Sequence, residues 1–176
     1  GRAVTRGAKQ ALVVVDLPQG TYEDSTTQAV ASARRVIEET DAQAVKLEGG
    51  VEMAATVAAI VSAGVPVLGH IGLLPQKAEH RGAFKIQGRD DEGAKKVIAD
   101  AMASEITEQV AVPTIGIGAS PACDGQILVS EDMLGLFADF TPKFVKKYAE
   151  LGGAIEQAVK EYAQDVRKGA FPGLEH

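Results

Sequence analysis

Two kinds of hydrophobic segment alternate along the chain. Short apolar runs that end in Gly, Pro or Asp predict buried strands, and longer Ala-rich stretches with apolar residues three or four apart predict helices. The predicted strands are 11–15, 44–47, 65–69, 113–117 and a less regular 126–129. The predicted helices are 25–39, 51–63, 91–103 and 142–168. This alternation is typical of an α/β fold with a parallel sheet.

The last predicted helix carries a long apolar stripe. Because Gly152 and Gly153 interrupt it, we expect a kink or a division into two helices. Since no linker-like stretch is present, we expect residues 1–176 to form a single domain with a C-terminal helical tail, 142–168. The stripe would pack on the chain itself or form a partly wet contact. It consists of Phe144, Tyr148, Leu151, Ile155, Val159, Tyr162 and Val166.

Composition and charge exclude several classes of protein. The chain has 18 Lys and Arg against 24 Asp and Glu, a formal net charge of −6, which argues against nucleic-acid binding. With 45% hydrophobic and 24% charged residues, the composition is that of an ordinary globular protein. A single cysteine cannot form an intrachain disulfide, and no stretch approaches the roughly 18 apolar residues of a membrane span. We therefore expect a cytoplasmic protein with neither a nucleic-acid nor a membrane partner.

Polar side chains gather at the ends of the predicted strands. Asp16 follows the first strand, Lys46 and Glu48 end the second, and His70 follows the third. A Gly-rich segment, 116–125, follows the fourth. Because active sites of parallel α/β folds lie at the carboxyl ends of the strands, these positions are candidates for function.

Lys46 and Glu48 point to the same face of their strand, since side chains alternate. Two charges on a buried face are costly unless they are paired or used, so they form either a structural ion pair or a metal ligand beside an anion-binding cation. Asp16 either braces the turn before Pro18 or joins Glu48 as a second hard oxygen ligand. In the second case the chemistry favours Mg²⁺ over zinc, because neither Cys nor paired His is near.

Other polar groups carry a weaker signal. His70 is either a hydrogen-bonded structural histidine or a residue that lines the site. Asp90 and Asp91 are read as a helix N-cap with first-turn acids. The Gly-rich segment lacks the Lys-Ser/Thr of a P-loop, and Cys123 has no base near it in the sequence. We assign neither nucleotide binding nor thiol chemistry to this segment.

Seven sequence strings occur in a fixed order: VVVDLPQGTY, DAQAVKLEGG, GVPVLGHIGLLPQ, FKIQGRD, VPTIGIGASPACDGQILVSEDMLGL, TPKFVKKYAELG and GAFPGLEH. Together they resemble the ketopantoate hydroxymethyltransferase family over essentially the whole chain. The resemblance implies a (β/α)8 TIM barrel of the phosphoenolpyruvate/pyruvate superfamily. It also implies Mg²⁺ as cofactor and a homo-oligomer, typically a decamer.

The resemblance assigns roles to three of the residues above. Asp16 of VVVDLP is a metal ligand that also contacts the keto acid, Glu48 of VKLEGG is a second metal-site carboxylate, and Lys46 binds substrate. The implied reaction transfers a hydroxymethyl group from 5,10-methylenetetrahydrofolate to 3-methyl-2-oxobutanoate. Its product, 2-dehydropantoate, is an intermediate of pantothenate synthesis.

The chain departs from the family in two places. The N-terminal strands, with a TAYD stretch and a VGDS-like motif, are missing before Gly1, although a whole barrel needs ~250 residues. An internal AGAF strand that ends in the general-base glutamate is missing between Ala103 and Ser104, so the catalytic base is unknown. We expect the chain to be discontinuous at this link, whereas peptide-linked Cα atoms lie about 3.8 Å apart.

Two other functions are compatible with these residues. One is a different Mg²⁺-dependent enolate enzyme of the same superfamily, such as a carbon–carbon lyase, although no cysteine-containing lid loop is apparent. The other is a non-catalytic barrel relic that acts as a binding module. Retention of Asp16, Lys46 and Glu48 argues against the relic.

Overall fold

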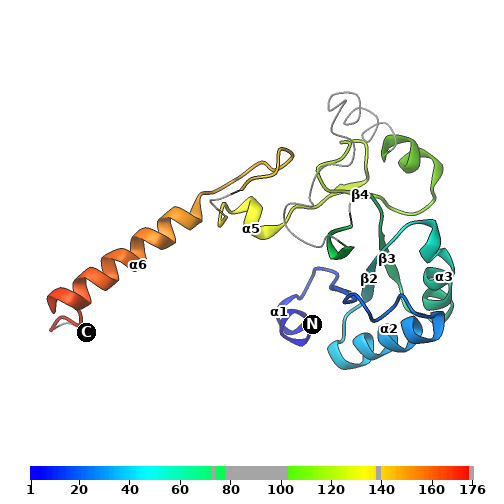
Figure 1. The fold of residues 1–176 in the computed structure, drawn as a ribbon, viewed down its shortest axis with the longest axis horizontal. Helices are drawn as coiled ribbons and strands as arrows, with labels where there is room; N and C mark the ends of the chain where they lie inside the picture. The colour runs from blue at the N-terminus through cyan, green and yellow to red at the C-terminus, as the bar shows by residue number, and fades with distance from the viewer. Residues whose placement is uncertain (73, 78–102, 138–139, 175–176) are drawn as a thin grey trace. The chain divides into compact units, whose positions relative to one another are not determined.

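The computed structural model describes residues 1–72, 74–77, 103–137 and 140–174 (Figure 1). They belong to two compact units, Gly1–Arg89 and Asp90–His176, and each unit is described by itself. Nearly all of the predicted helix 91–103, together with Asp90 and Asp91, lies outside the described residues.

The first unit contains a parallel three-stranded sheet in the order β1-β2-β3. Its strands are β1 (Val14–Asp16), β2 (Ala44–Glu48) and β3 (Val67–His70). The chain crosses from β1 to β2 through α2 (Thr26–Thr40), and from β2 to β3 through η1 (Val51–Met53) and α3 (Ala54–Ser62). A short helix, α1 (Arg2–Gly7), precedes the sheet, and a 3-10 turn, η2 (Pro75–Lys77), follows it. The α/β fold with parallel strands is therefore confirmed.

The core of this unit lies between the sheet and its helices. Ala29 and Ala33 of α2 are fully buried, as are Val45 and Leu47 of β2, and all four belong to one apolar cluster. Since side chains alternate along a strand, Lys46 and Glu48 must point to the opposite face. Burial of the apolar residues of β2 therefore orients its charged residues. The cluster is completed by Leu17, Tyr22, Met53, Ile60 and Val65.

Local sequence signals explain the bounds of α2. The Oγ of Ser25 accepts the backbone N–H of Gln28 at 3.1 Å and so caps the helix. Asp41 ends the helix in the left-handed region, with φ of 57°. The predicted helix 25–39 agrees with these bounds. The predicted helix 51–63 instead begins as the 3-10 turn η1 and continues as α3.

Among its described residues, the second unit contains a two-stranded parallel sheet and three helical segments. Its strands, β4 (Ile115–Gly116) and β5 (Gly125–Gln126), are shorter than expected, and β5 contains only the first residue of the predicted strand 126–129. Its helices include α5 (Ser130–Met133) and α6 (Leu151–Lys168).

Two expectations about the C-terminal helix are wrong. Residues 142–150 are not helical, and α6 runs unbroken through Gly152 and Gly153 instead of bending there. Both glycines fall in the first turn, where N–H groups have no partner within the helix. Here the N–H of Leu151 donates to Leu134 O and that of Gly152 to Gly135 O, both at 3.0 Å. The loop that supplies these carbonyls decides where the helix begins.

The expected break between Ala103 and Ser104 is not seen in the structure. Residues 103–109 are helical, so the link lies inside one helix. The hydroxyl of Thr107 donates to Ala103 O at 2.7 Å, one turn back. The structure is therefore helical and continuous at the link where the sequence departs from the family.

A closed barrel is not formed by the strands that the structure describes, which lie in a three-stranded and a two-stranded sheet. Across the same residues, no helix has both the length and the apolar character needed to cross a bilayer.

Candidate active site

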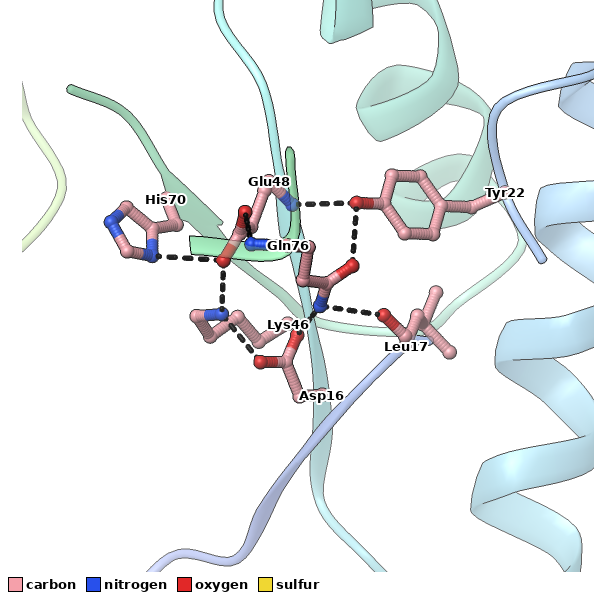
Figure 2. Close-up of polar contacts among 7 residues, drawn as sticks. All are labelled: Asp16, Leu17, Tyr22, Lys46, Glu48, His70 and Gln76. Atoms are coloured by element: carbon pink, nitrogen blue, oxygen red, sulfur yellow. Dashed lines mark hydrogen bonds and ion pairs between the residues drawn. The ribbon is translucent and has the colours of Figure 1, made fainter. Parts of the chain in front are cut away.

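Four polar residues lie together at the carboxyl ends of the three strands in the first unit (Figure 2). In the strand register Asp16 of β1 pairs with Lys46 of β2, and Glu48 of β2 pairs with His70 of β3. Register partners on parallel strands point to the same face. The structure thus brings together Asp16, Lys46, Glu48 and His70 on the face opposite the helices.

The ammonium group of Lys46 lies between two carboxylates. Its Nζ is 2.6 Å from Asp16 Oδ2 and 3.6 Å from Glu48 Oε1. The side chain of Asp16 is 47% exposed, whereas that of Lys46 is 22% and that of Glu48 only 2% exposed. The ion pair expected from the sequence is therefore present, and it is open to solvent on the Asp16 side.

Glu48 is a buried carboxylate with a partner on each oxygen. Its Oε2 accepts the backbone N–H of Gln76 at 3.0 Å. Its Oε1 faces Lys46 and also His70 Nδ1, which is 3.7 Å away. Because a buried charge is costly without such partners, they explain how Glu48 is held at the end of β2. Next to it, Gly49 has a φ of 144° and donates its N–H to His70 O at 3.0 Å.

Sequence reasoning did not identify two residues that connect this cluster. The side-chain amide of Gln76 donates to Asp16 Oδ1 at 3.2 Å and to Leu17 O at 3.1 Å. The hydroxyl of Tyr22 lies 3.3 Å from Gln76 Oε1 and 3.3 Å from the backbone N of Glu48 (Figure 2). Both residues follow the ends of strands, in the strings VVVDLPQGTY and GVPVLGHIGLLPQ. The signal in the sequence that could have identified them as site residues is their position shortly after a strand.

The pKa of Tyr22 is raised above its ordinary value, chiefly because burial disfavours the phenolate. The negative charges of Glu23, Glu48 and Asp16 act in the same direction, while the N–H of Glu48 opposes them. Tyr22 therefore keeps its proton at neutral pH and can donate it to Gln76.

The donor set is compatible with a hard divalent cation. Asp16 and Glu48 offer carboxylate oxygens, and Mg²⁺ is commonly bound by one or two carboxylates while substrate and water supply the rest. Among the described residues, no group of three or more His, Cys, Asp and Glu could hold a metal by itself. The residues fit Mg²⁺ shared with a substrate, and they do not fit a closed zinc site.

The Gly-rich segment belongs to the second unit, where its polar groups contact residues on either side of it in the sequence. Asp124 Oδ2 accepts the backbone N–H of Thr114 at 2.8 Å and its hydroxyl at 3.1 Å. These bonds lower the pKa of Asp124. Ser120 Oγ lies 2.8 Å from Ser104 Oγ, and Ser120 O accepts the side-chain amide of Gln126 at 2.9 Å. Cys123 is a free, partly buried thiol.

Comparison with known proteins assigns the chain to a family. A family model described as ketopantoate hydroxymethyltransferase matches residues 1–105 and 97–174, which together are nearly the whole chain. The chain belongs to the ketopantoate hydroxymethyltransferase family. A 3-methyl-2-oxobutanoate hydroxymethyltransferase from Mesorhizobium japonicum is 54% identical over the full chain and 68% of its own length. Proteins of the same name from Agrobacterium fabrum and Bordetella petrii are each 52% identical, with 70% and 71% of their lengths covered.

These family relatives contain residues that the chain lacks internally. Each alignment extends over 195 positions, although the chain has 176 residues, so at least 19 aligned positions have no residue here. The two matches to the family model meet within residues 97–105. This junction includes the Ala103–Ser104 link, where the sequence had indicated a missing strand.

Proposed function

We propose that this protein transfers a hydroxymethyl group from 5,10-methylenetetrahydrofolate to 3-methyl-2-oxobutanoate, giving 2-dehydropantoate. The observation that carries the proposal is the joint placement of Asp16, Lys46 and Glu48 at the ends of neighbouring parallel strands. The names of the relatives support the same acceptor substrate. We further propose that the site belongs to a TIM barrel, as the family resemblance implies, and that the enzyme is cytoplasmic.

In this proposal Asp16 and Glu48 hold Mg²⁺, and Asp16 also contacts the keto acid. The bound ion would polarise the keto oxygen and make the adjacent C–H more acidic. Glu48 is held by Gln76 and Lys46, so its carboxylate keeps one orientation. Half-exposed Asp16 is the carboxylate that an incoming ligand can reach first.

Lys46 is suited to bind the negative charge of the keto acid. Its ammonium already lies between two carboxylates and is partly exposed, so it can turn toward an anion that enters beside Asp16. A fixed cation at this place also stabilises the negative charge that develops as an enolate forms. His70, 3.7 Å from Glu48, would line the same site.

One observation favours a second candidate function. Removal of the C3 proton needs a base, and the family resemblance places that glutamate in the internal strand that this chain lacks. The gap of at least 19 aligned positions agrees with this loss. A chain that retains the keto-acid site without the base would act as a binding module.

Product analysis separates these candidates. The full chain is incubated with 3-methyl-2-oxobutanoate, Mg²⁺ and 5,10-methylenetetrahydrofolate, and 2-dehydropantoate is measured by mass spectrometry. We expect product only when both folate and Mg²⁺ are present. Turnover of a keto acid without folate would instead indicate a lyase, and calorimetric binding of the keto acid without product would indicate the binding module.

A matched pair of variants tests the site itself. Asp16→Asn removes the negative charge from the candidate ligand and should lower turnover at least about 100-fold, because a preorganised charge at a reacting centre contributes this much. Asp24→Asn makes the same change at an exposed carboxylate whose side chain contacts Gln28 instead, and it should keep wild-type turnover. Equal rates in the two variants would contradict the assignment.

A further inference from the structure

Gln76 contacts both candidate metal-site carboxylates, yet it carries no charge and follows the third strand. Its side chain donates to Asp16 Oδ1, and its backbone N–H donates to Glu48 Oε2. We propose that Gln76 is a positioning residue that holds Asp16 in the orientation needed to bind the keto acid with its cation. This inference rests on the proposed function, because that function defines what Asp16 binds.

The hydrogen bonds around Gln76 run in one direction. The backbone N–H of Glu48 donates to the hydroxyl oxygen of Tyr22, so the Tyr22 proton is free to donate to Gln76 Oε1. This places the Gln76 amide nitrogen toward two acceptors, Asp16 Oδ1 and Leu17 O. Because the Tyr22 hydroxyl donates to Gln76 Oε1, a flipped amide would set donor against donor. The chain of bonds therefore ends on the Asp16 carboxylate.

This arrangement matters because the other partner of Asp16 has a second task. Lys46 holds Asp16 Oδ2 through a long, flexible side chain, and an incoming anion would compete for the same ammonium. Gln76 holds the other oxygen, Oδ1, with an amide that is itself held at Leu17 and Tyr22. When Lys46 turns to the substrate, Gln76 still defines the position of Asp16.

The alternative role for Gln76 is to brace its loop through Tyr22 alone. Two variants separate these roles. Gln76→Met removes every polar contact of the side chain, whereas Gln76→Glu keeps an acceptor for the Tyr22 hydroxyl but loses the donor to Asp16. If positioning is the role, both variants should weaken Mg²⁺-dependent binding of 3-methyl-2-oxobutanoate about 10-fold, the effect expected for one hydrogen bond to a charged group.

The chain offers a matched control. The amide of Gln28 also donates to a backbone carbonyl, Gly20 O, and to a carboxylate, Asp24 Oδ2. Gln28→Met therefore removes the same kinds of bond beside a carboxylate outside the candidate site, and it should bind the keto acid like wild type. Thermal unfolding of each variant shows whether it is folded. If Gln76→Met is unfolded, the keto-acid affinity of Gln76→Glu alone tests the positioning role.

A double-mutant cycle tests whether Gln76 acts through Asp16. Keto-acid affinity is measured by ligand-observed NMR, which reaches weak binding, for Asp16→Ala, Gln76→Met and the double variant. The double variant should bind no more weakly than Asp16→Ala alone, because the group that Gln76 positions is already gone. Two results would overturn the inference. One is wild-type keto-acid affinity in Gln76→Glu, and the other is a double variant whose loss of affinity equals the product of the two single-variant losses. Failure of the proposed function is read separately, as absence of keto-acid binding or of product in the wild type.

Discussion

Lys46 occupies the space that a cation shared by Asp16 and Glu48 would also use. Its ammonium is 2.6 Å from one carboxylate and 3.6 Å from the other. The side chain is therefore both a counter-charge for the two carboxylates and a competitor for a metal ion. Binding of a keto acid would resolve this conflict, since the substrate offers Lys46 a new anionic partner.

Replacing this lysine separates its two effects. Lys46→Met should bind Mn²⁺, in the absence of keto acid, at least about 10-fold more tightly than wild type, because removal of a positive charge this close favours another cation. The same variant should lose turnover. Free Mn²⁺ is measured by electron paramagnetic resonance. The control is Lys9→Met, which changes the net charge equally at an exposed position. Unchanged Mn²⁺ affinity in Lys46→Met would contradict competition between the Lys46 ammonium and a metal ion.

In the second unit, the hydrogen bonds that Asp124 accepts from Thr114 can be tested through the pKa of Asp124. Its pKa lies below the ordinary value of 3.8, first because of the Thr114 backbone N–H and then because of the Thr114 hydroxyl. A depressed folded-state pKa means that the carboxylate stabilises the fold above pH ~3.8 and that this contribution is lost as the pH falls through the folded pKa. Thr114→Val keeps the N–H and removes the hydroxyl, so the pKa should rise part of the way back. A carboxyl NMR titration that gave the same pKa in both proteins would disprove this account.

At the scale of elements, the start of α6 contains two adjacent glycines in different surroundings. A Cβ on Gly153 would meet nothing within 4 Å, whereas a Cβ on Gly152 would lie 2.9 Å from Leu136 O and 3.0 Å from Gly135 O. Gly153→Ala should therefore stabilise the protein by about 0.5–1 kcal/mol through the lower entropy of the unfolded chain. Gly152→Ala should destabilise it, because rigid backbone must move. Urea unfolding that ranked the two variants in the opposite order would show that the loop does not hold the helix as described.

At the scale of the whole molecule, the described part of the second unit leaves an apolar stripe on α6 uncovered. Exposed apolar surface of this extent marks an interaction site more often than a free surface. We propose that identical chains cover it in a homo-oligomer larger than a dimer, in line with the closed symmetric assembly that the family resemblance implies. The stripe residues in α6 are between 41% and 60% exposed: Leu151, Ile155, Val159, Tyr162 and Val166.

Sedimentation at micromolar concentration tests this assembly. Wild-type protein should sediment as an oligomer larger than a dimer, and Val159→Lys should lower the mass because it places a charge in the stripe. Gln157→Lys introduces the same residue at an exposed polar position of the same helix and should leave the mass unchanged. A wild-type protein with the mass of a single chain would reject the proposal.

The sequence alone located the strands of the first unit and identified the polar residues at their ends. Hydrophobic runs located β1, β2 and β3, and alternation along β2 placed Lys46 and Glu48 on one face. These inferences succeeded because the period of a strand is a local property, visible in consecutive residues. The same local patterns did not locate the start of α6, because carbonyls of Leu134 and Gly135 decide it.

Only the tertiary structure decided which groups hold the candidate site together. Gln76 reaches Asp16 across 60 positions of sequence, and Tyr22 reaches the backbone of Glu48 across 26. No periodic pattern encodes such pairs, because they depend on how the loops after β1 and β3 fold back over the sheet. The chemistry of the carboxylates could be expected from their residue types, whereas their orientation depends on neighbours that are close only after folding.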